Sequence, residues 1–596
     1  MPILQSGFPK VSGGLEYFLC LALSGAARIR KSLLKCAVLF LASTTPALGQ
    51  SADPAPPKFF LMTPTGVNLF DTSFTQESTD LVIGPLSLTR SYISSRIRSS
   101  EYFGNKWTHN FDIWAEEQSL PGQNYVVIVI GRATYRYYGT AASNVPETDE
   151  AGTSVASVSG SIVFTDRDGV VYRFTPTVTN SPQRISSITY PDGSITTVSY
   201  SSWRPKTIVS NRGYAIVLDY SGTSERVSAA CTFNLSQIYI SISTTCSSAT
   251  AKTAYTYSPV SSMYDLVSVT DVSGKLSQYA YDSAYNALSC IKPPGYAACK
   301  VALVYGANIF GGSEFVLKSQ TFADGSIWQF ECSCGMNAKN DPDEAYPIEG
   351  TTVTKPDGST TQTLFQSGTL YRVTNENGQI YSFEYHVKTP LWMKTPEGVQ
   401  TFWLYNGNGV DSGIILKAKS GSGQADITIG AKTFPASCNP VTCNKPLTVA
   451  DARSNATNYT YDATHGGVIS EMRPSATSGA ARPLTLHTYV QKYAYIKNSG
   501  GSLVASAMPV WLSSTITQCQ TTAGSSTAAC DTGAPITVTT FEYGADGTAD
   551  NLLVRGEVEA TNTPSGAPTL RTCYGYDAQN NKIWETTPRA GLTSCS

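Results

Sequence analysis

Apolar and polar residues alternate along most of the chain in short runs, and turns that contain glycine separate the runs. In "SGSIVFTDRDGVVYRFTPT" (159–177) the alternation continues on both sides of Asp168-Gly169. A period of two around a central Gly turn is typical of a β-hairpin. The same arrangement returns at Asp192-Gly193, at Gly274, at Asp324-Gly325, at Asp357-Gly358 and at Asn377-Gly378. The pattern therefore predicts a long succession of antiparallel hairpins.

Three of these runs end on the same motif, an aromatic residue, any residue, a tyrosine and an aspartate. The copies are Tyr279, Tyr281 and Asp282; Tyr459, Tyr461 and Asp462; and Tyr574, Tyr576 and Asp577. Residues two apart in a strand face the same side, so stacked copies are expected to form aromatic ladders. The aspartate is expected to accept backbone N–H groups as the chain turns. Because a lone hairpin cannot bury its face, we interpret the motif as repeat architecture and not as one active site.

The composition agrees with an all-β fold of stacked antiparallel hairpins. The 596 residues include 34 Tyr, 48 Gly and 32 Pro, but only 7 Met. Tyrosine favours strands, while glycine and proline favour turns. Charged residues make up 14% of the chain and the net charge is -2, so the sequence has no electrostatic footprint for nucleic acid.

The first 49 residues are predicted to be a secretory signal peptide, with a start that extends further upstream than usual. A basic segment precedes a short apolar run at 36–42, and Ala47-Leu48-Gly49 is typical of a cleavage site before Gln50. The apolar run is too short to span a bilayer, so no transmembrane segment is expected in the mature chain. The alternative is a buried N-terminal helix. A Pro-rich linker follows at 50–58.

The cysteines also indicate export to the cell surface, the periplasm or the medium. Twelve remain after the signal peptide, and most lie near another in the sequence, which suits local disulfides in an oxidising compartment. The candidate pairs are Cys231 with Cys246, Cys290 with Cys299, Cys438 with Cys443, Cys519 with Cys530, and Cys573 with Cys595. Cys332 and Cys334 are too close in a strand to pair without strain, so their partners stay open. No C-x-x-C occurs and only four His are present, so no metal site is expected.

A second pair of motifs lies near the N-terminus, within 83–116. The positions concerned are Gly84, Leu86, Arg90 and Tyr92, followed by Phe103, Gly104, Trp107, His109, Phe111 and Asp112. His109 and Asp112 invite comparison with a general base and its partner. On one continuous strand, however, Trp107, His109 and Phe111 would share a face that Asp112 does not. We therefore expect a structural role for this segment.

No other pattern of residues indicates catalysis or a cofactor. G-x-S-x-G, P-loop and H-E-x-x-H motifs are absent from the sequence. The acids of "DPDE" (341–344) are interpreted as a solvated turn and not as a glycosidase pair. We therefore expect that the chain is not an enzyme and that it has no catalytic residues and no cofactors.

These motifs together resemble those of the RHS/YD-repeat family. The resemblance covers about residues 60–596: an N-terminal module at 59–125 and a degenerate repeat array at 126–596. It implies a β-ribbon that spirals into a full or partial shell, as in Tc toxins and teneurins. Toxin-type members close the shell with an Asp-Pro self-cleavage motif. Here the Asp-Pro sites, at Asp53 and Asp341, lack that pattern, so autoproteolysis and a toxin effector are not expected.

The sequence thus predicts an exported, non-enzymatic RHS/YD β-shell or cell-surface interaction protein. One interpretation makes it the front portion of a longer toxin-delivery or contact-dependent polypeptide. The alternative is a secreted β-rich protein that binds carbohydrate or acts on polysaccharide. The partners expected are glycans, or a downstream polypeptide that continues the sheet beyond the last repeat.

Overall fold

The computed structural model describes residues 61–95, 102–120, 122–131, 133–146, 151–175, 182–221, 226–260, 263–308, 315–333, 348–386 and 389–595. The chain divides into two units, 1–50 and 51–596, and all described residues belong to the second. The predicted signal peptide and linker lie outside the described residues, as do Cys334 and the "DPDE" segment.

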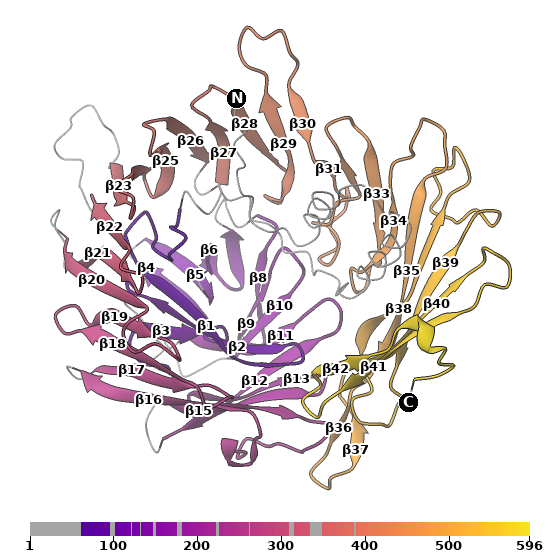
Figure 1. Ribbon diagram of the computed structural model, residues 1–596, viewed down its shortest axis with the longest axis horizontal. Coiled ribbons are helices and arrows are strands. Elements are labelled where there is room, and N and C mark those ends of the chain that lie inside the picture. Colours follow the sequence, from indigo (N-terminus) through magenta and orange to yellow (C-terminus); the bar gives the residue numbers. More distant parts are fainter. Residues whose placement is uncertain are drawn as a thin grey trace, which may run out of the picture. The chain divides into compact units, whose positions relative to one another are not determined.

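The described residues form antiparallel β-sheets with two short 3-10 helices, η4 and η5, and this confirms the all-β fold (Figure 1). A three-stranded sheet comprises β1 (Thr75–Ile83), β2 (Leu86–Ile93) and β3 (Trp107–His109). The first part of the large sheet comprises β4 (Ile113–Leu120), β5 (Gln123–Ile130), β6 (Ala133–Thr140), β7 (Ser143–Pro146), β8 (Ser154–Val158), β9 (Ser161–Thr165), β10 (Val171–Thr175), β11 (Gln183–Thr189), β12 (Ile195–Ser201), β13 (Arg204–Ser210), β14 (Tyr214–Tyr220), β15 (Val227–Asn234), β16 (Lys252–Val260) and β17 (Met263–Thr270).

The large sheet continues with β18 (Leu276–Asp282), β19 (Ala287–Lys292), β20 (Val301–Ala307), β21 (Phe315–Phe322), β22 (Ile327–Cys332), β23 (Ile348–Thr354), β24 (Thr360–Gln366), β25 (Thr369–Thr374), β26 (Ile380–His386), β27 (Thr389–Lys394), β28 (Gln400–Tyr405), β29 (Asp411–Lys417) and β30 (Ile427–Ile429). A ten-stranded sheet comprises β31 (Ala431–Thr433), β32 (Thr448–Ala450), β33 (Ala456–Tyr461), β34 (Val468–Met472), β35 (Pro483–Lys492), β38 (Val510–Gln520), β39 (Thr537–Tyr543), β40 (Val554–Thr561), β41 (Leu570–Tyr576) and β42 (Lys582–Glu585). The remaining elements are the hairpin β36 (Tyr495–Lys497) with β37 (Leu503–Ala505), and the helices η4 (Cys246–Ser248) and η5 (Pro588–Ala590).

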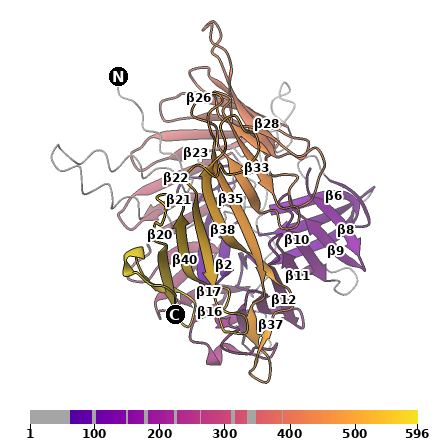
Figure 2. The same ribbon diagram turned by 90° about the vertical axis from the view of Figure 1, so that its right-hand side faces the viewer.

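Neighbours along the chain are, with few exceptions, neighbours in a sheet, as the hairpin pattern predicts. Figure 2 shows β35, β38 and β40 of the ten-stranded sheet, in which β35 pairs with β38 and β39 lies between β38 and β40. One additional pairing joins β11 to β4, through Gln183 opposite Ala115 and Arg184 opposite Trp114. In the described part of the chain, no helix is long and apolar enough to cross a membrane.

The glycine turns have a common construction, seen at 271–275. Gly274 adopts φ 77°, a conformation in which a side chain would be strained, and its N–H donates to the Asp271 carbonyl at 2.9 Å. The Asp271 carboxylate accepts the N–H groups of Ser273 at 2.8 Å and Lys275 at 2.9 Å. An aspartate at the start of the turn and a glycine three residues later therefore close the hairpin.

A β-bulge recurs in the hairpins of the large sheet and of the ten-stranded sheet, where it lies at an aromatic residue near the end of a strand. Between Thr256 and Tyr257, for example, the opposite strand advances from Ser268 to Leu266, so one extra residue is accommodated there. The aromatic residues at these bulges are Phe174, Tyr200, Tyr220, Tyr257, Tyr281, Tyr305, Phe365, Tyr385, Tyr405, Tyr461, Tyr489, Tyr543 and Tyr576. The repeat is thus a bulged hairpin whose bulge lies opposite the motif tyrosine.

The main hydrophobic core joins the three-stranded sheet to the large sheet. It runs from Val67 to Phe383 in the sequence and includes the buried motif residues Tyr92, Phe103 and Trp107. The ten-stranded sheet contributes no residue to this cluster and contains a small cluster of its own around Met472.

Turns of the early repeats contact the ten-stranded sheet and its insert. Trp511 N–H donates to the Asp192 carbonyl at 2.8 Å. The Asp550 carboxylate accepts the side chains of Asn234 and Ser236, both at 2.8 Å, and of Asn580 at 2.7 Å. These hydrogen bonds therefore connect the large sheet to the ten-stranded sheet at these points.

Candidate functional site

The N-terminal motif residues converge on a buried ion pair between β1 and β2. The Arg90 Nη2 atom donates to Asp80 Oδ1 at 2.9 Å, and its Nε atom donates to Oδ2 of the same carboxylate. The two side chains are 1% and 5% exposed, so the pair is shielded from water on all sides. A bidentate geometry of this kind is the strong form of the arginine–carboxylate contact.

Aromatic residues of the repeats complete the surroundings of Arg90. Its guanidinium lies 4.8 Å from the ring centre of Trp107, 5.6 Å from that of Tyr255 and 6.0 Å from that of Tyr279. The Tyr255 hydroxyl also donates to Asp80 Oδ2 at 2.8 Å. Burial lowers the pKa of Arg90, but the charge and hydrogen bonds of Asp80 together with Tyr279 and Tyr255 outweigh burial and hold the pKa above its ordinary value. The arginine is therefore a permanent cation inside an aromatic cage.

Trp107 and Tyr92 connect the N-terminal module directly to a repeat motif. The Trp107 Nε1 atom donates to the Tyr281 hydroxyl at 2.8 Å, and its ring meets the Tyr279 ring edge-on at 5.3 Å between centres. The Tyr92 hydroxyl accepts the Leu288 N–H at 2.8 Å. One copy of the aromatic-x-Tyr-Asp motif thus forms part of the surface on which this module packs.

The expectation of one continuous strand through His109 and Asp112 is wrong. Strand β3 ends at His109, and the Asp112 N–H donates back to the His109 carbonyl at 2.9 Å, so the chain turns between them. His109 is 1% exposed, its Nδ1 atom accepts the Phe111 N–H at 3.3 Å, and its ring packs against Tyr102 and Phe103. Asp112 accepts the Thr108 hydroxyl at 2.7 Å. These contacts close a turn.

The remaining motif residues of the module serve close packing. Leu86, Phe103 and Phe111 are buried in the main core. Gly104 adopts φ 89°, and a Cβ atom there would lie 2.7 Å from the Tyr264 carbonyl of β17. A Cβ atom at Gly84 would overlap the ring of Tyr214. Glycine is thus required at both positions because the module lies directly on the repeats.

The motif tyrosines form a chain of hydrogen bonds that the sequence pattern did not reveal. The Tyr281 hydroxyl donates to the Leu266 carbonyl at 2.9 Å, and Leu266 lies opposite Tyr257, the bulge tyrosine of the preceding hairpin. The same rule describes nine bonds: Tyr200 to Ile185, Tyr220 to Pro205, Tyr257 to Val227, Tyr281 to Leu266, Tyr305 to Leu288, Tyr405 to Pro390, Tyr489 to Val468, Tyr543 to Ser513 and Tyr576 to Val554. Each hydroxyl therefore ties its hairpin to the bulge of the one before.

Two positions vary this rule. The Tyr461 hydroxyl donates to the Pro446 carbonyl at 2.9 Å, just ahead of β32. Tyr385 follows the hairpin of Phe365, and its buried hydroxyl has no hydrogen-bond partner among the described residues. Tyr459 and Tyr461 also stack on each other, with 6.3 Å between their ring centres.

The motif aspartates accept backbone N–H groups at the turns that follow. Asp282 accepts Ala284 N–H at 2.8 Å, Asp462 accepts Thr464 N–H at 2.8 Å, and Asp577 accepts Gln579 N–H at 2.9 Å. Burial raises the pKa of Asp462, but the backbone N–H donors of its turn outweigh burial and hold the pKa below its ordinary value. The pKa of Asp577 is held below its ordinary value chiefly by the Asn581 side chain and backbone. The carboxylates are thus engaged by their own turns.

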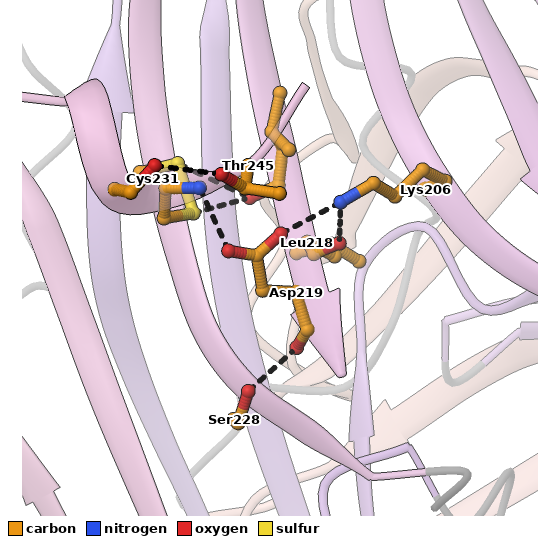
Figure 3. Close-up of a disulfide and its surroundings, with 9 residues drawn as sticks. Lys206, Leu218, Asp219, Ser228, Cys231 and Thr245 are labelled. Atoms are coloured by element: carbon orange, nitrogen blue, oxygen red, sulfur yellow. Dashed lines mark hydrogen bonds and ion pairs between the residues drawn. A yellow bond between two sulfur atoms is a disulfide. The ribbon is translucent and has the colours of Figure 1, made fainter. Parts of the chain in front are cut away.

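Five disulfides join the five cysteine pairs that sequence spacing singles out: Cys231–Cys246, Cys290–Cys299, Cys438–Cys443, Cys519–Cys530 and Cys573–Cys595. Figure 3 shows Asp219 between the first of these and Lys206. Its carboxylate accepts the Cys246 N–H at 2.7 Å and pairs with Lys206 Nζ at 2.6 Å. Disulfides in this number are typical of an oxidising environment.

One buried acid at the module contact was not found from the sequence. Asp265, in β17, is fully buried, and the side chains that act on its carboxylate are Asn105 and Lys106 of the module. Burial raises its pKa to about 6, while nearby Lys106, itself half-buried, has a pKa lowered by burial to about 8. Asp265 is buried only because the 104–106 turn of the module packs against it, so no local sequence pattern indicates a buried acid.

Comparison with known proteins places the recognisable sequence in the N-terminal module. Residues 66–133 match the family described as Domain of unknown function (DUF6531). The matched segment contains β1 to β3 and therefore Asp80, Arg90 and Trp107. No curated protein matches the sequence.

Among solved structures, the chain is similar to the crystal structure of TcdB2-TccC3. The two share 12% identity and a TM-score of 0.31 over 78% of this chain and 22% of the other. It is also similar to the Tc holotoxin pore of Photorhabdus luminescens, at 10% identity and a TM-score of 0.27 over 85% of this chain and 26% of the other. The chain thus spans about a quarter of the length of these structures.

The described residues hold no group of three or more His, Cys, Asp or Glu side chains arranged to bind a metal ion. What the arrangement around Arg90 provides is a rigid joint: a buried ion pair, a cage of aromatic rings and hydroxyl bonds that cross from the module to the repeats.

Proposed function

We propose that this chain is an exported, non-enzymatic scaffold of the RHS/YD type, which acts as a shell wall or as a cell-surface interaction protein. One observation carries the proposal. The residues that would have to perform chemistry, in the N-terminal motif and in the repeat motif alike, are engaged in bonds that build the ribbon.

The N-terminal motif supports this view most directly. Arg90 forms an ion pair with Asp80 next to aromatic rings, and the Trp107 indole N–H donates a hydrogen bond to Tyr281 of a repeat. His109 is enclosed by Tyr102 and Phe103 and is 1% exposed. A general base needs access to the proton that it removes, and this packing denies that access.

The repeat motif supports it through its hydrogen bonds. A tyrosine hydroxyl that donates to a backbone carbonyl, and an aspartate that accepts two N–H groups of its own turn, are held in fixed structural roles. Stacked repeats of this kind give an extended surface, which is what a wall or a contact surface requires. The five disulfides are consistent with a protein that functions outside the reducing cytoplasm.

The proposal is tested on the full chain, produced with export and compared with His109→Ala and Asp112→Asn variants. We expect the exported protein to have the ten cysteines of the five pairs blocked to thiol reagents. We expect no turnover of chromogenic glycosides or esters by any of the three proteins. His109→Ala should instead lower the melting temperature, because a buried ring is lost from an aromatic cluster.

Two outcomes would contradict the proposal. The first is a turnover that disappears in Asp112→Asn while that variant melts like the parent protein. The second is an accumulated protein that stays in the cytoplasm with free thiols.

A further inference from the structure

The loop between β15 and η4 exposes several large apolar side chains. Ile238 is 36%, Tyr239 is 47% and Ile242 is 46% exposed. In the β36–β37 hairpin, Val504 is 40% exposed. Apolar side chains that are scattered singly over a surface are normal, whereas several that lie together mark an interaction site. These four side chains are called the apolar tip below.

The β36–β37 hairpin lies against the base of this loop. The Lys497 N–H donates to the Leu235 carbonyl at 2.8 Å. Ile240 of the loop and Ile496 of the hairpin pack against the same small apolar cluster. Val504 lies directly opposite Ile496 in the hairpin and therefore shares its face. The loop and the hairpin thus carry the apolar tip together.

The loop is fixed at both of its ends. The Cys231–Cys246 disulfide closes it, as Figure 3 shows, and the Asp219 carboxylate accepts the Cys246 N–H at 2.7 Å. At the start of the loop, the Ile238 N–H donates to the Asn234 carbonyl at 3.2 Å. Because the backbone is already held in place, the exposed side chains can bind a partner with little loss of conformational entropy.

The charges around the apolar tip are arranged for an anionic surface. Residues 227–251 include no charged side chain. Lys252 follows them and is exposed, and the partly exposed Lys497 lies in the hairpin. The two acids that contact the ends of the loop are engaged, Asp219 by an ion pair and Asp550 by hydrogen bonds. An apolar tip flanked by lysines complements a layer of anionic headgroups above an apolar interior.

The size of the apolar tip favours a bilayer over a protein partner. Each of its four side chains has less than half of its surface exposed. Together they offer far less than the roughly 800 Å² per partner that a standard protein–protein interface buries. A bilayer needs no matched second surface, and tyrosine is enriched at the level of the headgroups.

We propose that the 237–242 loop and the adjoining face of the β36–β37 hairpin bind the surface of an anionic lipid bilayer. The aliphatic side chains of the apolar tip enter the boundary between headgroups and acyl chains, and Tyr239 lies at the level of the headgroups. Lys252 and Lys497 face the lipid phosphates. This inference rests on the proposed function, because only an exported protein meets a membrane from outside the cytoplasm.

The test uses the exported full chain and vesicles of phosphatidylcholine, either alone or mixed with phosphatidylglycerol. Sedimentation gives the bound fraction, and amide hydrogen exchange gives the site. We expect binding that is stronger with the mixed vesicles, and slower exchange at 237–244 in the bound protein.

Two multiple variants separate the apolar tip from other exposed apolar residues. Ile238→Ser, Tyr239→Ser and Ile242→Ser together should weaken binding at least about tenfold, because less apolar surface leaves water. The control changes Val304→Ser in β20 and Ile327→Ser in β22, which are 55% and 44% exposed, and should bind like the parent protein. Unchanged melting temperatures of both proteins show that the fold is intact.

The lysines are tested separately. Lys252→Gln and Lys497→Gln should each weaken binding to the mixed vesicles about fivefold, because each removes one charge near the headgroups. Binding to phosphatidylcholine alone should stay as in the parent protein. An equal loss with both kinds of vesicle would contradict the assignment to anionic lipid.

Binding of the triple variant like the parent protein, or an equal loss in the triple variant and its control, would overturn the inference. So would self-association that the triple variant abolishes in a protein that ignores vesicles, because the occupant would then be a second copy. A protein that is exported, oxidised and inert towards substrates but does not bind vesicles would overturn this inference alone. Retention in the cytoplasm with free thiols would instead contradict the proposed function, whatever the vesicles show.

Discussion

The repeats under the N-terminal module and the repeats of the ten-stranded sheet follow one hairpin rule but are stabilised differently. In β14 the first five residues are buried, and Tyr279 of β18 packs against Trp107. In β39 every residue is only partly buried. Both regions have hydroxyl bonds and disulfides, but the first adds a large apolar core with a buried charge, whereas the second has only a small apolar cluster. The same hairpin pattern can therefore form either a buried apolar core or a sheet that is largely exposed to solvent.

The buried ion pair offers the largest expected difference between the two regions. Arg90→Ala leaves Asp80 charged, buried and without its partner, so the free energy of unfolding should fall by about 3–5 kcal/mol. Lys582→Ala breaks an exposed pair in β42, where the two side chains are 43% and 52% exposed, and should cost about 0–1 kcal/mol. Urea unfolding of both variants makes the comparison. Similar losses would mean that Arg90 is not enclosed.

The terminal disulfide should matter locally in the second region. Its cysteines are 22 residues apart, and closing a loop of this size is worth about 3 kcal/mol in the chain-entropy model. Replacing Cys573 and Cys595 by Ser should speed amide exchange in β41 and β42. Exchange in β14 should remain as in the parent protein. A uniform acceleration throughout the chain would contradict the separation of the two regions.

Asp265 predicts a pH dependence that belongs to the covered region. Its folded pKa of about 6 is raised above the ordinary value, so its carboxyl group stabilises the fold at low pH, and this contribution is lost as the pH rises through 6. Asp265→Asn keeps the shape and cannot ionise. The variant should gain roughly 2 kcal/mol over the parent protein above about pH 7 and little below about pH 4. An advantage that does not change with pH would contradict the buried acid.

A smaller effect compares the same tyrosine position in the two regions. The Tyr281 hydroxyl donates to Leu266 and accepts from Trp107, whereas the Tyr461 hydroxyl donates to Pro446. Tyr281→Phe should therefore cost about 2 kcal/mol and Tyr461→Phe about 1 kcal/mol in thermal or urea unfolding. If Tyr461→Phe proved the costlier change, the module contact would carry less than its geometry indicates.

The sequence predicted the hairpins because alternation and glycine turns are local signals. The Asp271 to Gly274 turn and the Cys231–Cys246 pair are both encoded within a few residues of themselves. The aromatic motif was interpreted as architecture and ladders of stacked rings were expected, but the hydroxyl-to-carbonyl bonds were not. Those bonds depend on a bulge in the preceding hairpin, and the sequence does not mark a bulge.

The N-terminal contact was predicted only in outline. Arg90 and Trp107 were singled out, while Asp80 and Tyr255, which complete the cage, were not. Tyr255 lies 165 residues beyond Arg90 in the sequence, and only the closure of the ribbon brings them together. The turn at 109–112 was missed because the apolar pattern continues through it.

The claim that the N-terminal motif is a joint between module and repeats is tested most directly by a double-mutant cycle on Trp107 and Tyr281. Both are changed to Phe, singly and together, which removes the bond of 2.8 Å between the indole N–H and the hydroxyl. Unfolding energies should show a coupling of about 1 kcal/mol between the two positions, as expected for residues in contact. Additive losses, with a coupling indistinguishable from zero, would contradict the joint.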